Sequence, residues 1–244
     1  MNRKLIFVLK ALGLAMILFV ALFPLFWMFI TSGKTMTELL EIPVTLWPES
    51  FSFESYYEVW VQKPFPTYIF NSLKISIVAT LLGMIVSSMA AYGFAKFRFP
   101  LKKAILMFVL VAQMFPSTSI IIPLFSTYRN YGLYDTHIGL MLLYTTISLA
   151  FSVWMMYGYF RGVPMELEEA ARIDGCGPLG IFTKVILPIS KPGVAAVGVY
   201  SFMVAWNEYL YSLILLTSEK NYTSSIGLSR FITEFGTYWN QMGA

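Results

Sequence analysis

The sequence has little of the chemistry on which metalloproteins and disulfide-bonded domains depend. Its 244 residues include one cysteine, Cys176, and one histidine, His137. A single cysteine excludes an intrachain disulfide and a cysteine cluster for a metal, and a single histidine argues against a histidine-based metal centre. The phosphate-binding pattern G-x-x-x-x-G-K-[ST] is absent as well. We therefore expect no cofactor, no metal site and no catalytic residue, and the chain is not expected to be an enzyme.

Charged residues are also scarce. They make up 12% of the chain and apolar residues make up 57%, whereas soluble domains contain about 25% charged residues. A helix that crosses the hydrocarbon core of a bilayer needs about 20 consecutive apolar residues. Such runs cover residues 11–30, 75–95, 104–128, 138–160 and 193–218. These runs predict an all-α polytopic membrane protein with five visible spans in a single transmembrane domain, 1–244.

The basic residues indicate the orientation of these spans. If the five runs alternate across the membrane, eleven of the 17 lysines and arginines lie on one side, together with the N-terminus, five lie on the other, and Lys74 lies at the outer end of the second run. Cytoplasmic loops carry the excess of positive charge. We therefore predict a cytoplasmic N-terminus, an extracytoplasmic loop at 31–67 and a cytoplasmic loop at 161–192. The net charge of +4 follows from this bias and does not indicate nucleic-acid binding.

The first run is interpreted as a span and not as a cleaved secretory signal. Its 20 uncharged residues exceed the apolar region of a typical signal peptide, and no small-residue cleavage site follows it. The outer loop that comes next contains five glutamates and four prolines. We expect this loop to form an ordered extracytoplasmic cap with a short amphipathic helix near 53–61.

The loop 161–192 contains the most informative sequence of the chain. Pro164 is followed by three glutamates in the next five residues. This is typical of a helix start, because proline fits the first turn and carboxylates favour the positive end of the helix dipole. Gly175 stands where a left-handed residue would end that helix. A second helical segment is expected at 179–187, stopped by Pro188.

The middle of the first loop helix has the composition of a docking surface. Ala170 and Ala171 are small enough to let another protein approach closely, and Glu169 and Arg172 can fix the orientation of that protein through charge pairs. From physical chemistry alone, the alternative remains open that the loop is a solvated helical hairpin that merely joins two spans.

The spacing in this loop resembles a known signature. Glu169-Ala170-Ala171, three residues, Gly175, nine residues and Val185-Ile186-Leu187-Pro188 is similar to the EAA signature of ABC-importer permeases, with valine in the usual isoleucine place. In that family the loop forms a coupling helix that docks in a cleft of the ATP-binding subunit. The resemblance implies this docking role for Glu169, Ala170, Ala171, Arg172 and Gly175.

Weaker similarities extend over nearly the whole chain. Their order and spacing resemble the maltose-type, MalG-like permeases, which import carbohydrates. The matching segments are 71–73, 91–95, 122–125, 132–136 and 206–208.

The resemblance implies the transmembrane domain of a type I ABC importer, a MetI-like helical bundle in the cytoplasmic membrane of a prokaryote. That bundle has six spans, so the resemblance leads us to expect a sixth span that these 244 residues do not include; the alternative left open is that five spans are the natural state. The implied function is the import of a sugar or sugar-like solute by alternating access. The implied partners are a second, MalF-like permease subunit in a heterodimer, two ATP-binding subunits, an extracytoplasmic solute-binding protein and the lipid bilayer.

A few polar residues within the spans are candidates for the solute pathway. Glu208 is the one acidic residue in the five runs, and a charge at the centre of a bilayer costs about 2.5 to 3.5 kcal/mol on insertion scales. Trp206 and Asn207 adjoin it and offer an aromatic face and an amide of the kind sugars bind. Gln113 lies in the third run, and Pro116 after it can kink the helix. The alternative for these residues is interhelical hydrogen bonding and packing.

Two other functions compete with the importer hypothesis. A secondary transporter or channel would couple to ions through buried acids, and transport without ATP-binding partners would favour it. An intramembrane enzyme would need a nucleophile and a base within the spans, but His137 and Cys176 both lie near or outside the predicted membrane boundaries.

Overall fold

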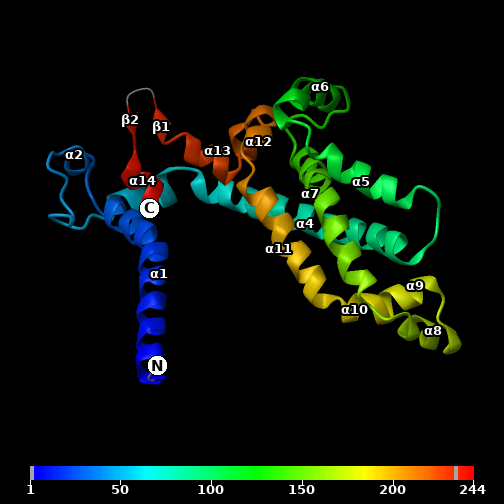
Figure 1. Ribbon diagram of the computed structural model, residues 1–244. Helices are drawn as coiled ribbons and strands as arrows, with labels where there is room; N and C mark the ends of the chain where they lie inside the picture. Colours follow the sequence, from blue (N-terminus) through cyan, green and yellow to red (C-terminus); the bar gives the residue numbers. More distant parts are fainter. Residues whose placement is uncertain (1–2, 234–235) are drawn as a thin grey trace. The chain divides into compact units, whose positions relative to one another are not determined.

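The computed structural model describes residues 3–233 and 236–244, and these residues are mainly helical (Figure 1). Contacts divide the chain into two compact units, one formed by residues 1–66 with 227–244 and the other by residues 67–226. The second unit contains most of the predicted membrane helices and all of the loop 161–192. The two units are described separately below.

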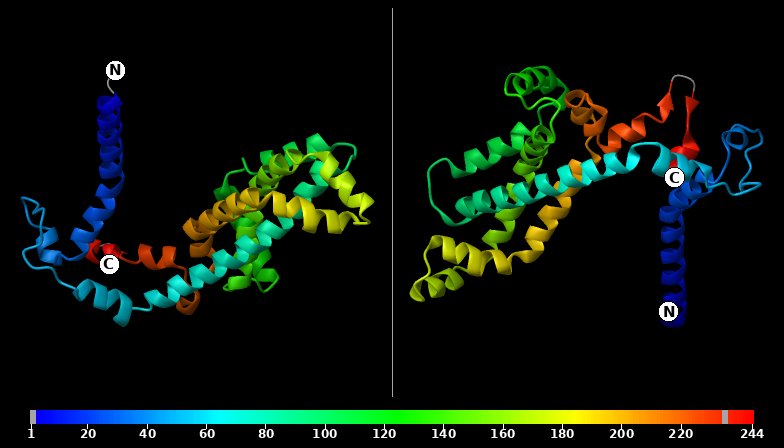
Figure 2. Two further views of the ribbon diagram at one scale, coloured as in Figure 1. Left: turned by 90° about the horizontal axis from the view of Figure 1, so that it is seen from below. Right: turned by 180° about the vertical axis from the view of Figure 1, so that it is seen from behind.

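The second unit is a bundle of long and short helices. Its elements in chain order are α4 (Phe65–Lys96), α5 (Lys102–Ala112), α6 (Ser117–Asn130), α7 (His137–Arg161), α8 (Met165–Ile173), α9 (Pro178–Ile181), η2 (Phe182–Ile186), α10 (Leu187–Ile189), α11 (Lys191–Asn207), α12 (Leu210–Leu215), η3 (Glu219–Asn221) and the start of α13 (Ser224–Ser229). Helices α7 and α11 pack along one another (Figures 1 and 2). Ser152 on α7 and Ser201 on α11 are hydrogen-bonded, with 3.2 Å between their Oγ atoms. Small polar residues of this kind allow helices in a membrane to approach closely.

Two buried apolar clusters hold the second unit together. One contains Ile75, Leu140, Tyr144 and Leu215, which come from α4, α7 and α12. The other lies where the loop helices meet the ends of α4, α5, α7 and α11. Its central residues are Tyr92, Leu106, Phe160, Ala171, Phe182, Ile186 and Val197. The loop 161–192 is therefore packed onto the bundle and is not a freely solvated hairpin.

Three helices of the described residues are long and apolar enough to cross a membrane. They are Ile6–Ser32 within α1 (Arg3–Ser32), Phe65–Lys96 and His137–Arg161. A fourth is counted if α11 and the helical segment Pro178–Ile189 before it are taken as one span, although these two are bent by 80°. Three of the predicted runs, 11–30, 75–95 and 138–160, each lie within one continuous helix.

The predicted run 104–128 does not form one continuous helix. Its residues are divided between α5 and α6, with a turn at 113–116. Pro116, with φ −58° and ψ 123°, is outside the helical region. A proline has no backbone N–H to continue the α5 ladder, and its preceding residue is pushed away from the helical conformation. The break is thus stronger than the kink that the sequence predicted.

The run 193–218 is broken as well. Helix α11 ends at Asn207, and Glu208 is extended, with φ −72° and ψ 128°, before α12 begins at Leu210. This break is stabilised by side-chain hydrogen bonds that the sequence pattern does not reveal, and they are described with the candidate site.

The second half of the loop 161–192 differs from the sequence prediction. The helical segment was expected at 179–187 and Pro188 was expected to stop it, but the chain remains helical from Pro178 to Ile189 and turns at Ser190. Residues 182–186 form a π-helical turn. Pro188 falls in the first turn after that wider segment, where the backbone N–H that proline lacks is not needed. The prediction that Pro188 ends the helix was wrong.

The first unit is built around the end of α1. Its other elements are α2 (Met36–Leu39), α3 (Glu54–Tyr57), η1 (Glu58–Gln62), the antiparallel pair β1 (Ile232–Thr233) and β2 (Gly236–Thr237), and α14 (Trp239–Gly243). The helix expected near 53–61 is present as α3 and η1. Ser32 and Tyr56 share a hydrogen bond of 2.7 Å, and Trp60 donates one of 3.1 Å to the carbonyl of Ala244. These bonds order the segment that follows α1.

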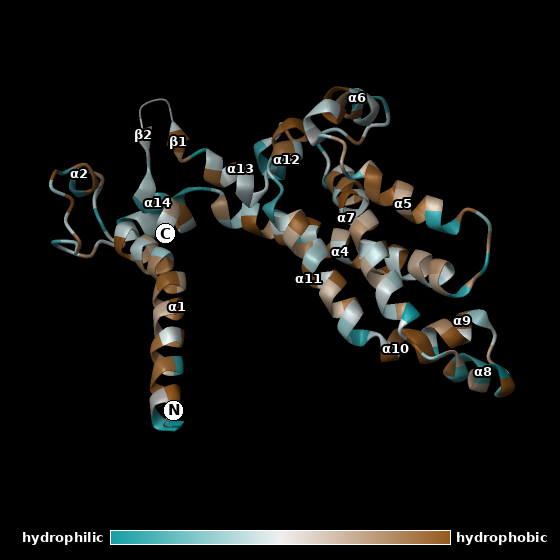
Figure 3. Cartoon of the chain, viewed as in Figure 1, coloured by the Kyte–Doolittle hydropathy of each residue, from teal (hydrophilic) through white to brown (hydrophobic). Residues whose placement is uncertain are grey.

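Most of the apolar side chains of α1 are exposed. None of the residues in its most apolar stretch of 18 residues is buried, and Figure 3 shows hydrophobic residues along its length. In water such a surface would be strongly unfavourable. This apolar surface is suited to contact with lipid or with another membrane helix.

A polar network closes the connection between α6 and α7 in the second unit. Asp135, at a left-handed φ of 55°, accepts hydrogen bonds from the backbone N–H groups of Thr217 and Ser218 at 2.9 and 3.0 Å. The Ser218 hydroxyl and the Asn221 amide also donate to it. Although desolvation alone would raise the pKa of Asp135, these donors lower it to about 2.

We predict that Asp135→Asn lowers the thermal stability of the subunit in detergent at neutral pH. Asparagine tolerates the left-handed conformation but gives up one acceptor oxygen. Because the folded pKa of Asp135 lies below its ordinary value of 3.8, the stabilisation is complete above that value and is lost as the pH falls toward 2. The difference in Tm between the wild type and the variant should therefore shrink from pH 5 to about pH 2 to 3. A difference that does not change with pH would contradict this.

Candidate functional site

Helix α8 presents most of the predicted docking residues at the surface. Glu169, Ala170, Arg172 and Gly175 are all exposed. Helix α8 begins directly after Pro164, as expected, and its acidic first turn contains Glu166 and Glu168. The structure therefore brings these four predicted residues together on one short exposed segment.

Ala171 does not belong to this surface. It is 7% exposed and packs in the apolar cluster with Phe160 and Phe182. A helix of nine residues has one face turned inward, and Ala171 lies on it, three residues after the buried Glu168. The interpretation that Ala171 lets a partner approach closely is therefore replaced by a packing role, since its small side chain lets α8 lie close to the bundle.

Gly175 ends α8 in the manner the sequence predicted. Its φ is +81°, in the left-handed region. The N–H of Gly175 bonds to the carbonyl of Arg172 at 3.0 Å, and the N–H of Cys176 bonds to that of Ala171 at 2.9 Å. This pair of bonds is the Schellman pattern of helix termination, which favours glycine at the left-handed position.

Large apolar side chains next to this turn were missed by the sequence analysis. Ile173 is 87% exposed and Leu179 is 70% exposed. They flank the α8–α9 turn, and Met165 and Leu167 on α8 are exposed too. The sequence carries no local signal for them, because the inward face of α8 is known only from the buried positions of Glu168 and Ala171 in the folded bundle. An exposed apolar group with charged residues beside it is typical of a protein-binding surface.

The buried ion pair of Glu168 was also missed by the sequence analysis. It is 1% exposed, and its Oε1 lies 2.5 Å from Nζ of Lys96, the last residue of α4. Lys96 also donates a hydrogen bond of 3.2 Å to the carbonyl of Val163. The sequence showed Glu168 only as one of several acidic residues in a helix start, because the partner is 72 positions away and tertiary folding brings the two together.

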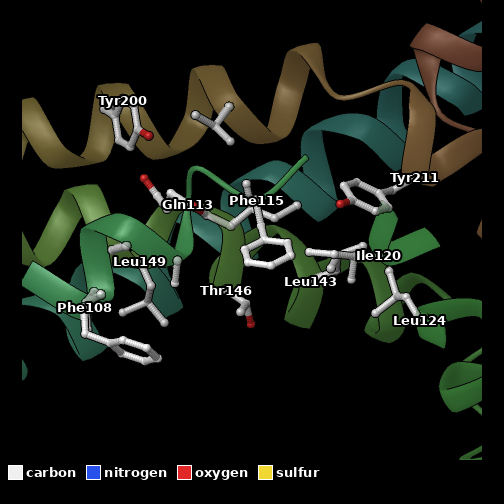
Figure 4. A pocket seen from close by; sticks show the side chains of 15 residues that line it. Phe108, Gln113, Phe115, Ile120, Leu124, Leu143, Thr146, Leu149, Tyr200 and Tyr211 are labelled. Atoms are coloured by element: carbon white, nitrogen blue, oxygen red, sulfur yellow. Dashed lines mark hydrogen bonds between the residues drawn. The ribbon is translucent and has the colours of Figure 1, made fainter. Parts of the chain in front are cut away.

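Gln113 lines a cavity of about 620 Å³ in the second unit, among residues of α5, α6, α7, α11 and α12 (Figure 4). Its amide donates a hydrogen bond of 2.7 Å to the carbonyl of Ile147, which leaves the amide oxygen as an acceptor. Tyr200, Tyr211 and Thr146 contribute the other polar groups of a mainly apolar lining. A mostly apolar cavity with few polar groups is typical of a small-molecule site.

Both carboxyl oxygens of Glu208 accept hydrogen bonds within the bundle. One carboxyl oxygen accepts hydrogen bonds from the hydroxyl of Tyr144 at 2.8 Å and the N–H of Ser212 at 3.1 Å, and the other accepts from the N–H of Tyr211 at 2.8 Å. Tyr144 is 1% exposed. Glu208 thus caps the first turn of α12 and ties it to α7, as in the interhelical alternative considered for this residue.

The neighbours of Glu208 do not join Gln113 at the cavity. Trp206 stacks on Phe202 of its own helix, with 5.7 Å between ring centroids. Asn207 is exposed and donates to the carbonyl of Met203, one turn earlier, at 2.8 Å. Of the four candidate pathway residues, only Gln113 lines the cavity described above. A pathway role for Trp206, Asn207 and Glu208 stays a prediction.

The chain is similar to known membrane components of transport systems. Residues 79–238 match the family described as binding-protein-dependent transport system inner membrane component. The inner membrane ABC transporter permease protein YcjP of Escherichia coli (strain K12) is 34% identical over 234 residues, which are 95% of this chain and 84% of that protein. The diacetylchitobiose uptake system permease protein NgcG of Streptomyces coelicolor is 34% identical over 212 residues, 87% of this chain and 70% of that protein.

The fold also has a solved counterpart. A chain from the crystal structure of a bacterial ABC transporter involved in the import of the acidic polysaccharide alginate aligns with a TM-score of 0.82 and 24% identity. The alignment covers 100% of this chain and 91% of that chain. At this level of identity the likeness concerns the fold.

Proposed function

The chain belongs to the family of binding-protein-dependent transport system inner membrane components, and from this we propose that it is the permease subunit of an ATP-driven importer. Family membership makes it a multi-pass inner membrane protein with a transport role and confirms the predicted all-α, MetI-like fold. The proposed solute is a sugar or sugar-like molecule, which is supported by the diacetylchitobiose uptake permease among its relatives.

The observation that carries the proposal is the surface of the α8–α9 turn. Glu169, Ala170 and Arg172 are exposed there, next to the highly exposed Ile173 and Leu179, and the segment has its opposite face fixed to the bundle. Two ATP-binding subunits, one for this chain and one for a second permease subunit, would grip such segments. With the N-terminus in the cytoplasm, this loop faces the cytoplasm, where ATP is available.

The proposed mechanism is alternating access. A solute-binding protein delivers the solute at the outer face, and closure of the ATP-binding subunits moves the α8–α9 segment as a rigid body. The break between α5 and α6 and the break at Glu208 divide spans into shorter helices, which can reorient as units. We propose that Gln113 faces the solute pathway, because it is a polar residue in the lining of the cavity of about 620 Å³.

The function is tested by reconstitution of the chain with its partner permease, ATP-binding subunits and binding protein in proteoliposomes. We expect ATP hydrolysis to rise when binding protein loaded with one particular sugar is added, and that sugar to accumulate inside. A panel of mono-, di- and oligosaccharides identifies the solute. Accumulation without the ATP-binding subunits would instead support a secondary transporter, and ATP hydrolysis that no solute stimulates would contradict the proposal.

A further inference from the structure

Lys96 and Glu168 form a buried ion pair between the end of α4 and the middle of α8. Their side chains are 10% and 1% exposed, and 2.5 Å separates Nζ from Oε1. The hydrogen bond from Lys96 to the carbonyl of Val163 adds a contact to the segment just before α8. One lysine therefore binds both α8 and Val163, which lies two residues before α8 begins.

The other contacts beneath α8 are of a different kind. Ala171 lies in a cluster of apolar side chains that includes Phe160, Phe182 and Val197. Apolar contacts are non-directional, so they resist separation of two surfaces more than they resist sliding. A buried ion pair, by contrast, restrains the distance between its two charged atoms, because their attraction is strong where water is excluded. The Lys96–Glu168 pair thus sets the position of α8 relative to α4 more sharply than the cluster can.

Stability alone does not account for such a pair. Desolvation of two charges offsets much of their attraction, and apolar residues of similar volume often stabilise a protein as well or better. A fixed geometry is what the pair supplies in addition. The chain connects the loop 161–192 covalently to α7 and α11, whereas α4 ends 69 positions before α8 begins. The ion pair gives α4 a direct connection of its own.

We propose that Lys96 is a positioning residue that transmits the displacement of α8 to α4 during transport. Helix α4 runs without interruption from Phe65 to Lys96, so a displacement at Lys96 moves the whole helix. This inference rests on the proposed function, because it assumes that an ATP-binding subunit moves α8. In this inference Lys96, which lies outside the EAA segment, couples the motion of α8 to α4.

The test measures how many solute molecules enter per ATP hydrolysed by the full transporter in proteoliposomes. Lys96→Met and Glu168→Gln are expected to retain ATP hydrolysis while this ratio falls at least about fivefold, the lower end of typical coupling effects. Lys96→Arg should stay near the wild type because it keeps the charge. The exchanged pair Lys96→Glu with Glu168→Lys should recover part of the ratio. Lys103→Met, which removes an exposed lysine at the start of α5, is the matched control.

A merely structural pair would give a different result. In that case the neutral variants would reduce the amount of assembled complex but leave the ratio per complex unchanged, which would overturn the inference. If Lys96→Met fails to assemble, Glu168→Asp is compared with Lys96→Arg. Glu168→Asp keeps the charge but shortens the side chain. An unchanged ratio of solute to ATP in both variants would overturn the inference as well. A wild-type complex without solute-dependent ATP hydrolysis would overturn the proposed function itself, a result that is visible before any variant is made.

Discussion

Gly175→Glu is expected to abolish solute-stimulated transport while the subunit still inserts and folds. The substitution places a residue with a side chain at φ +81°, which costs about 1 to 2 kcal/mol for a residue other than glycine. It also puts a new carboxylate beside Ile173 and Leu179, in the surface assigned to the ATP-binding subunit. Because a buried unpaired charge costs several kcal/mol, docking should fail. The measurement is uptake into proteoliposomes together with pull-down of the ATP-binding subunits.

The neighbouring glycine provides a matched control for the backbone effect. A Cβ would meet nothing within 4 Å at either Gly175 or Gly177, but only Gly175 has a positive φ. Gly177 has φ −73°. Gly175→Ala should therefore weaken transport, and Gly177→Ala should leave it near the wild-type level. Normal uptake by Gly175→Glu would argue strongly against docking at this turn.

Glu208→Gln is expected to destabilise the subunit by about 1 to 3 kcal/mol, the range for an unsatisfied buried hydrogen-bonding group. Both carboxyl oxygens of Glu208 accept hydrogen bonds, and three donors depend on them. A glutamine has a single acceptor oxygen, and its amide group would face a donor. The hydroxyl of the buried Tyr144 or a backbone N–H of α12 would lose its partner. Thermal unfolding in detergent measures the effect.

Asn207→Ala is the control that shows whether any substitution at the break between α11 and α12 lowers the stability, or only the loss of the Glu208 carboxylate does. Asn207 is adjacent but exposed, and its amide bonds only to its own helix in the described hydrogen bonds. Its removal should change the Tm little. If Glu208→Gln keeps the wild-type Tm but changes uptake, Glu208 lines the solute pathway, and the structural assignment made above is wrong.

The start and end of α8 could be predicted from the sequence because their causes are local. A proline, an acidic first turn and a glycine at the left-handed position act within one or two turns of the backbone. The existence of the long apolar helices was predictable for a similar reason, since a run of about 20 apolar residues has few alternatives to a membrane helix. The family resemblance also rested on residues that are close together in the chain.

The breaks in the predicted spans could not be located in this way. Apolar composition does not distinguish a continuous helix from two short ones, and Gln113 to Pro116 and Glu208 lie inside runs that are otherwise suitable for a span. At Glu208 the break depends on Tyr144, which lies 64 positions earlier on another helix. A local pattern carries no information about such a partner.

The sequence by itself determined the class of the protein, and it predicted an orientation and a segment that we propose as the docking surface for a partner. These properties follow from composition, charge bias and short-range backbone preferences. Only the tertiary structure decided which side of α8 faces outward, because the buried positions of Glu168 and Ala171 are set by Lys96 and by aromatic residues of other helices. Burial is a property of the packed bundle. Because the inward face of α8 has few apolar residues, that face cannot be predicted from the sequence of the helix.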